Sequence, residues 1–169
     1  MPRQVTLKGK PVNLLGPGLK VGDKAPAFRA VDGGFAPVQL ADYKGKVLII
    51  SAVPSLDTPV CSLQTQRFNK EIASLPAGVE MLTISMDLPF AQKRFCESQK
   101  VDRIRILSDH VWREFGQNYG LLIENMGLLA RSVWVIGKDG KIAYVQIVPE
   151  IAQEPDYAAA LKAAQAAAK

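Results

Sequence analysis

The most prominent hydrophobic pattern in the chain is a nearly continuous apolar run over residues 46–53. Its β-branched side chains are typical of a central strand that is covered on both faces. Pro54 ends this run, and residues 60–75 then place apolar side chains at helical intervals. Residues 79–85 alternate in part, so strand, helix and strand in succession predict a βαβ unit. The helical stripe expected to face the sheet consists of Val60, Leu63, Phe68, Ile72 and Leu75.

Shorter patterns predict the elements on either side of this unit. We expect a hairpin over residues 5–14, extended pieces at 27–31 and 37–40, helices at 89–99, 111–119 and 155–169, a strand at 104–107, and a second hairpin from 131–136 and 141–148. These elements predict an α/β protein with a mixed central sheet flanked by helices. A length of 169 residues predicts one domain, residues 1–169, with residues 1–16 as an added N-terminal β-hairpin.

Charge and hydropathy exclude several classes of partner. The chain has 21 Lys and Arg against 16 Asp and Glu, and most of the net charge of +5 lies in residues 1–24. This excess is thin and lacks the dense basic patch of a nucleic-acid-binding protein, so we expect no nucleic-acid partner. No apolar stretch approaches the ~20 residues that span a bilayer, and no secretory signal is present. We therefore expect a cytoplasmic protein without membrane association.

The chain contains two cysteines, Cys61 and Cys96, and one histidine, His110. Two cysteines are too few for a disulfide-rich scaffold, and with a single histidine they are too few for a four-ligand zinc site. We therefore expect no zinc site of this kind, and we interpret His110 as a surface or capping residue. In a reducing compartment, a pair of thiols favours redox chemistry over a structural bridge.

Cys61 is expected in the first turn of the helix that follows the central strand, at the edge of the sheet where ligand sites occur. The unpaired N–H groups and positive dipole end of a helix N-terminus favour thiolate over thiol. Thr58 can present its hydroxyl to the same point, and Pro54 and Pro59 stiffen the loop. These residues alone leave open the alternative that Cys61 is a small buried apolar side chain.

The spacing of Pro54, Thr58 and Cys61 resembles the active-site motif of the peroxiredoxins, Pro-x-x-x-Thr-x-x-Cys. The longer run Ser-Leu-Asp-Thr-Pro-Val-Cys at residues 55–61 is similar to that of the thiol peroxidase subfamily, whose members are atypical two-cysteine peroxiredoxins. The resemblance therefore indicates one branch of the family.

Three features outside the motif extend the resemblance to nearly the whole chain. The subfamily begins with an added hairpin, which residues 5–14 could supply. Its resolving cysteine lies on the helix after the next strand, which matches Cys96. Its active-site arginine starts a late strand, which matches Arg131.

The resemblance implies a thioredoxin-like fold and an enzyme that reduces hydrogen peroxide and organic hydroperoxides without metal, haem or flavin. Cys61 would be the peroxidatic cysteine, oxidised to a sulfenic acid. Cys96 would resolve it to a Cys61–Cys96 disulfide, which thioredoxin or a similar dithiol protein would reduce. Pro54, Thr58 and Arg131 would bind the substrate, with Thr58 and Arg131 also acting in catalysis. Family members commonly form homodimers.

Other interpretations remain for the same residues. Cys96 could be a core cysteine, and Arg131 could form a salt bridge at a strand edge. A disulfide reductase is weakened by the missing C-x-x-C pair. A thioredoxin-fold redox sensor or binding protein would use the disulfide as a switch rather than turn over peroxide.

Overall fold

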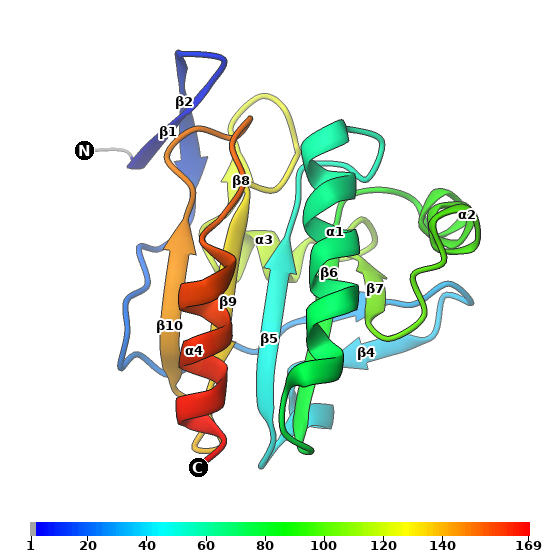
Figure 1. Ribbon diagram of the computed structural model, residues 1–169. Helices are drawn as coiled ribbons and strands as arrows, with labels where there is room; N and C mark the ends of the chain where they lie inside the picture. Colours follow the sequence, from blue (N-terminus) through cyan, green and yellow to red (C-terminus); the bar gives the residue numbers. More distant parts are fainter. Residues whose placement is uncertain (1–2) are drawn as a thin grey trace.

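The computed structural model describes residues 3–169, and its central feature is a seven-stranded mixed sheet in the order β10-β9-β5-β6-β7-β3-β4 (Figure 1). Its strands are β3 (Arg29–Val31), β4 (Pro37–Gln39), β5 (Val47–Ala52), β6 (Val79–Ser85), β7 (Arg105–Ser108), β9 (Ser132–Ile136) and β10 (Ile142–Ile147). A smaller sheet joins β1 (Arg3–Leu7), β2 (Lys10–Leu15) and β8 (Leu122–Ile123). The helices are α1 (Pro59–Glu71), α2 (Pro89–Gln99), α3 (Glu114–Asn118) and α4 (Tyr157–Ala167), with 3-10 turns η1 (Leu40–Tyr43) and η2 (Ile72–Ser74).

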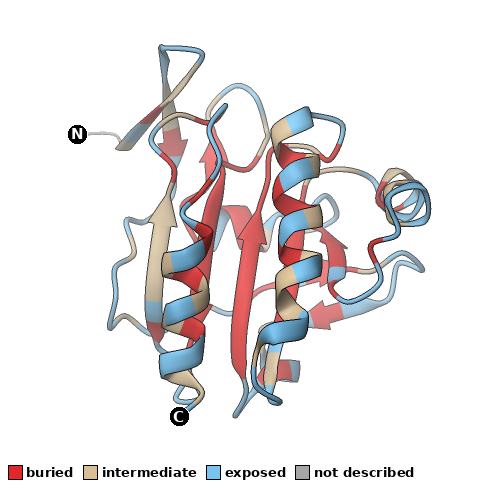
Figure 2. Ribbon diagram, in the orientation of Figure 1, coloured by how far each residue is buried: buried red, intermediate tan, exposed pale blue. Residues whose placement is uncertain are grey.

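Strand β5 lies inside the sheet, as the apolar run predicts. All of its residues are buried, and it pairs in parallel with β6 and antiparallel with β9 (Figure 2). Because side chains alternate along a strand, Val47 and Ile49 join one core cluster with residues of α1 and α4. Leu48 and Ile50 join the opposite cluster, which includes Phe115 of α3. The predicted βαβ unit and the mixed α/β class are both confirmed.

The stripe predicted for the helix after β5 is wrong in its composition. Leu63 is 53% exposed, whereas the buried residues of α1 include two polar side chains, Gln64 and Thr65. Cys61 and Phe68 complete the buried set. The face of α1 that packs on the sheet is therefore partly polar, and it includes Cys61. Its α-helical part begins at Pro59 and gives way to η2 after Glu71.

The helix predicted over 111–119 is much shorter in the structure. Arg113 has a left-handed backbone, with φ of 58°, so the α-helix begins only at Glu114. Phe115 and Tyr119 are nevertheless buried, and both rings contact Phe28. Strand β8 follows and escapes sequence prediction because it is only two residues long.

The N-terminal hairpin is present as predicted, although residues 1 and 2 of the expected extension lie outside the described part of the chain. Strand β2 pairs with β8, and Thr6 of β1 contacts the segment that follows β10. The Thr6 N–H donates to the carbonyl of Pro149 at 2.8 Å, and the N–H of Ile151 donates to the carbonyl of Thr6 at 2.8 Å. The hairpin is thereby joined to residues 149–151.

The remaining predicted elements are confirmed with small shifts at their ends. Residues 79–85 and 89–99 form β6 and α2 with the predicted bounds. The late hairpin is β9 and β10, and the Ala-rich segment forms α4. Within residues 3–169, the helices are all too short or too polar to cross a membrane.

A buried carboxylate beneath α3 makes the stability of the protein depend on pH. Asp109 accepts hydrogen bonds from the N–H groups of Phe115 at 3.1 Å and Gly116 at 2.8 Å. Burial nevertheless raises the pKa of Asp109 from 3.8 to about 6, because it disfavours the charged form more than the two donors favour it. The folded state thus binds this proton more tightly than the unfolded chain does.

The contribution of Asp109 to stability should be present below about pH 4 and lost as the pH rises through about 6. An Asp109→Asn variant does not titrate and lacks this loss. We expect its free energy of unfolding, relative to that of the natural chain, to rise over this window by an amount on the order of 3 kcal/mol. Thermal and denaturant unfolding at a series of pH values measures the difference. A difference that stays constant across the window contradicts the prediction.

Candidate active site

The candidate site begins in the loop between β5 and α1. Thr58 is the N-cap of α1, Pro59 occupies the first helical position, and Cys61 lies in the first turn as predicted. The Thr58 hydroxyl accepts from the Cys61 N–H at 3.4 Å and donates to the carbonyl of Ser55 at 3.1 Å. The local sequence therefore places the thiol at the end of the helix where the dipole is positive and N–H groups are unpaired.

Asp87, which sequence analysis missed, fixes the other end of this loop. Its carboxylate accepts from the Ser55 hydroxyl at 2.7 Å, from the Leu56 N–H at 2.8 Å and from the Ser85 hydroxyl at 2.7 Å. Ser85 ends β6, so the loop before α1 is bonded to the neighbouring parallel strand. No motif marked Asp87, because the partners that give it this role are distant in the chain.

Arg131 immediately precedes β9, and its buried guanidinium has three different partners. Its Nη2 donates to the Cys61 Sγ at 3.1 Å, and its Nη1 donates to the Gln64 Oε1 at 2.8 Å. Its Nε donates to the carbonyl of Ile151 at 2.7 Å. The alternative of a strand-edge salt bridge is wrong, because Arg131 forms no ion pair with any residue in the described part of the chain.

Cys61 has a positively charged neighbour although it is buried. The side chain is fully buried, so a charge on its sulfur depends on the groups that surround it. The Arg131 guanidinium supplies a charge-assisted donor, and the start of α1 supplies the positive dipole end. Burial alone would fit an inert apolar cysteine, but a buried arginine directed at the sulfur does not. This arrangement can carry out nucleophilic chemistry at sulfur.

A cavity of about 390 Å³ lies beside this site, although the buried Cys61 is not among the residues that line it. Pro54, Thr58 and Arg131, which the sequence predicted as substrate-binding residues, all line it. Its other walls are mainly apolar and come from the hairpin, from α1, from the segment after β8 and from the segment after β10: Leu7, Lys8, Pro59, Val60, Ile123, Met126, Leu128, Ile151 and Ala152. Among residues 3–169, no group of three or more His, Cys, Asp or Glu could hold a metal ion.

Cys96 is the predicted site residue that the structure does not bring to the others. It lies on α2, is half-buried, and packs against the same core cluster as Cys61, but both cysteines are free thiols. Burial, with a smaller contribution from the charge of Glu97, raises the pKa of Cys96. The two thiols therefore differ in environment: one faces a cation and a helix N-terminus, and the other is held in the neutral form.

Gln64 connects the guanidinium to the sheet and was also missed by sequence analysis. Its Oε1 accepts from Arg131, and its Nε2 donates to the Ser51 hydroxyl at 2.6 Å. Because Gln64 acts on the sulfur only through Arg131, it is a positioning residue. The Gln64 amide and the Ile151 carbonyl thus hold two different nitrogens of the guanidinium.

A Gln64→Met variant should lower the rate constant for oxidation of Cys61 by peroxide roughly tenfold, because Arg131 loses one of its fixed partners. The rate at which a dithiol reduces the oxidised protein should stay unchanged, which separates mispositioning from general damage. Stopped-flow kinetics measures both rates. Gln66→Met is the matched control, since Gln66 lies two residues along α1 and bonds only to Ser62. Equal effects of both substitutions would contradict the prediction.

A mixed sheet with a buried cysteine thiol at the start of a helix, bonded to an arginine, is the arrangement of a thiol-based redox protein. The comparisons with known proteins agree. The model of the Redoxin family matches residues 20–161. The thiol peroxidase of Oceanobacillus iheyensis is 52% identical to this chain, over 93% of this chain and 95% of that protein. The thiol peroxidase of Halalkalibacterium halodurans is 51% identical, over 96% of this chain and 98% of that protein.

The solved structures show the same relationship. The crystal structure of a peroxiredoxin-like protein from Aquifex aeolicus is 46% identical, covers 98% of each chain, and has a TM-score of 0.92. The chain belongs to the thiol peroxidase family of the peroxiredoxins. The expected thioredoxin-like fold is confirmed by this match.

Proposed function

We propose that this protein is a thiol-dependent peroxidase that reduces hydrogen peroxide and organic hydroperoxides to water and alcohols. The contact of 3.1 Å between Arg131 and the Cys61 sulfur is the observation that carries the proposal. The Cys61 thiolate attacks the terminal oxygen of the hydroperoxide, and the O–O bond breaks. The sulfur is oxidised to a sulfenic acid, the peroxide is reduced, and the departing alkoxide or hydroxide takes up a proton.

Three residues hold the peroxide in line with the sulfur in this proposal. Arg131 stabilises the negative charge that builds on the departing oxygen, because its donors are already in place before the reaction. The Thr58 hydroxyl and the Cys61 N–H, which bond to each other in this structure, would turn toward the peroxide and orient its two oxygens. Pro54 closes the wall of the cavity beside them. The mainly apolar lining supports organic hydroperoxides as substrates alongside hydrogen peroxide.

Cys96 completes the proposed cycle as the resolving cysteine. Its sulfur attacks the sulfenic sulfur of Cys61, an S–S bond forms, and water leaves. Both thiols are free and lie on different helices, so we propose that the start of α1 and the part of α2 around Cys96 unwind locally to bring the two sulfurs together. Residues 56–66 and 90–100 should then differ most between the two redox states. Equal hydrogen-exchange protection in both states would count against this step.

A dithiol protein of the thioredoxin type reduces the disulfide by exchange and returns both thiols. Since this reductant must be kept reduced, we place the protein in the cytoplasm. We also infer one domain for residues 1–169, with the hairpin of residues 1–16 as its extension. The bonds between Thr6 and residues 149–151 support that organisation.

Mass spectrometry of the intact protein tests the proposal. After one equivalent of peroxide, the protein should lose two hydrogens, and digestion should yield one peptide pair that joins Cys61 to Cys96. A Cys96→Ser variant should still form the sulfenic acid but should lose thioredoxin-dependent turnover. Full turnover in that variant would exclude the resolving role. If the protein is oxidised a single time after each reduction and does not turn over peroxide catalytically, the result would instead favour a redox sensor.

Exposed apolar residues at the start of α2 support the proposal of a homodimer. Phe90 is 71% exposed, and its ring contacts that of Phe35, which is 43% exposed. Leu88 lies two residues before Phe90 and is also exposed. Sedimentation should show a dimer that Phe90→Glu weakens and that Val21→Glu, at another exposed apolar site, leaves intact. Unchanged association in both variants would place the interface elsewhere.

A further inference from the structure

The largest cavity among those described lies at the end of the sheet opposite Cys61. Strand β5 runs between the two sites: its second residue, Leu48, lines this cavity, and the loop after its last residue, Ala52, leads into α1 and Cys61. The cavity has a volume of about 570 Å³, which is within the range of small-molecule sites. It shares no lining residue with the cavity beside Arg131. Nothing in the proposed peroxidase cycle uses it.

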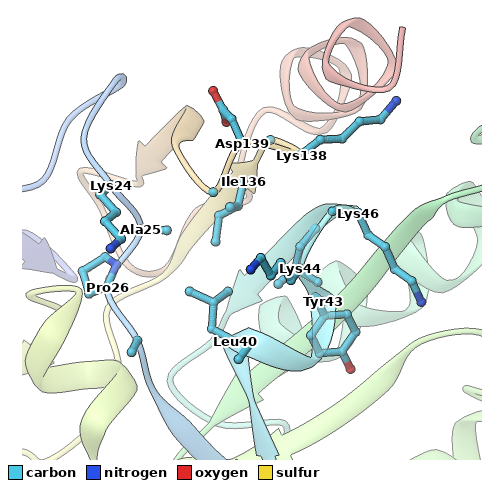
Figure 3. A pocket seen from close by; sticks show the side chains of 16 residues that line it. Lys24, Ala25, Pro26, Leu40, Tyr43, Lys44, Lys46, Ile136, Lys138 and Asp139 are labelled. Atoms are coloured by element: carbon cyan, nitrogen blue, oxygen red, sulfur yellow. The ribbon is translucent and has the colours of Figure 1, made fainter.

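The floor of this cavity is apolar and firmly held. Leu48, Ile136 and Ala25 are buried in the protein, and Leu40 and Ile136 point toward one another into the opening (Figure 3). One wall is fastened across the opening, since the N–H of Ala25 donates to the carbonyl of Gly140 at 2.9 Å. This bond fixes one wall of the cavity, whose apolar floor would accept an aliphatic chain.

The rim of the cavity is positively charged. Lys24, Lys44, Lys46 and Lys138 all line it. Lys46 pairs with Glu80, and Lys138 donates to the carbonyl of Ala168, so both side chains are directed away from the opening in Figure 3.

The other two lysines remain available. In Figure 3 the Lys44 side chain extends toward Leu40, and the Lys24 side chain belongs to the wall that also contains Ala25 and Pro26. Neither forms an ion pair with a carboxylate in residues 3–169.

The one acidic residue of the lining does not neutralise this charge. An Asp139 carboxylate oxygen accepts from the Lys141 N–H at 3.0 Å, and the side chain points away from the opening (Figure 3). An apolar pocket with unpaired ammonium groups at its mouth is complementary to a molecule with an aliphatic body and an anionic head.

We propose that this cavity is a second binding site, separate from the peroxidase site, for an aliphatic carboxylate. The hydrocarbon chain lies between Leu40, Leu48 and Ile136, and the carboxylate lies at the mouth within reach of Lys44 and Lys24. Burial of the chain supplies most of the affinity, and the ammonium groups select the charge of the head group. The proposal holds whether or not the peroxidase mechanism above is correct.

Sodium octanoate is the probe for this site, with sodium acetate and octylammonium as matched ligands that lack the tail or reverse the charge. Titration of isotope-labelled protein, followed by amide chemical shifts, should show saturable changes at Ala25, Leu40 and Gly140 for octanoate only. A Lys44→Glu variant should bind octanoate roughly tenfold more weakly, because attraction at the mouth becomes repulsion. Lys93→Glu, an exposed position on α2, makes the same change in net charge and should have no effect.

The outcomes separate the possibilities. Octanoate shifts at the named residues that Lys44→Glu weakens and Lys93→Glu does not would support the site. Equal binding of octylammonium would show that the carboxylate is not recognised. Shifts confined to Ile123, Met126 and Ile151 would place the anion in the cavity beside Arg131 instead. Either of these results, or the absence of saturable binding, would overturn the proposal.

Discussion

A Cys61→Ser variant should consume no measurable peroxide in the presence of a dithiol reductant. The thiolate is the reacting group, and a serine hydroxyl does not ionise under the conditions that give a thiolate. The substitution should leave the fold nearly unchanged, because a serine oxygen can still accept the hydrogen bond from Arg131. Peroxide consumption and thermal unfolding, measured on the same sample, separate loss of chemistry from loss of structure.

Cys96→Ser is the matched control, because it also removes one thiol but leaves Cys61 in place. It should react with the first equivalent of peroxide at nearly the natural rate, since the half-buried Cys96 is not bonded to the Cys61 site. Residual catalytic turnover in Cys61→Ser that survives removal of Cys96 would show that another group attacks the peroxide.

An Arg131→Lys variant should react with peroxide about 100- to 1000-fold more slowly, the loss typical when a preorganised donor is removed from a site of developing charge. Lysine keeps the positive charge but has a single donor group. It cannot reach the Cys61 sulfur, the Gln64 amide and the Ile151 carbonyl together, as the guanidinium does. Stopped-flow oxidation of Cys61 gives the rate, and ultraviolet absorbance gives the fraction of thiolate at neutral pH.

The same change should also lower the free energy of unfolding by about 1–3 kcal/mol, because a buried acceptor loses its donor. Arg105→Lys is the matched control, since Arg105 contacts Tyr43 and Asp32 at the surface. We expect it to keep both the rate and the thiolate fraction. If Arg131→Lys reacts with peroxide as fast as the unsubstituted protein, a positive charge alone is sufficient for the oxidation of Cys61, and the several N–H donors of the guanidinium are not needed.

The part of the site that the sequence reveals is the part built locally. Pro54, Thr58 and Cys61 lie within one loop and one helical turn, so their spacing already determines that the hydroxyl caps the helix and that the thiol enters its first turn. The central strand is equally local in origin, because a short continuous run rich in β-branched residues is typical of a strand buried on both faces.

The residues that sequence analysis missed owe their roles to distant partners. Gln64 and Asp87 are ordinary polar residues in the sequence, and only the crossing of α1, β6 and β9 gives each a bonding partner. The prediction that Leu63 is buried failed for the same reason. A hydropathy pattern contains no information about the Arg131 guanidinium, whose hydrogen bond requires the Gln64 amide to be buried instead. Helix α3 is shorter than predicted because Arg113 has a left-handed backbone conformation, which the pattern of apolar side chains does not indicate.

The pairing of the N-terminal hairpin with residues 149–151 determines where a label or surface is best attached to the protein. Thr6 bonds to the segment that ends at Ile151, and the Ile151 carbonyl bonds to Arg131, so the hairpin lies two bonded neighbours from the reactive sulfur. A dye, bead or electrode linked through Lys10 would transmit strain along that connection. A linker on Lys162 of α4 lies outside this connection, and is therefore the position to choose for a sensor built on this chain.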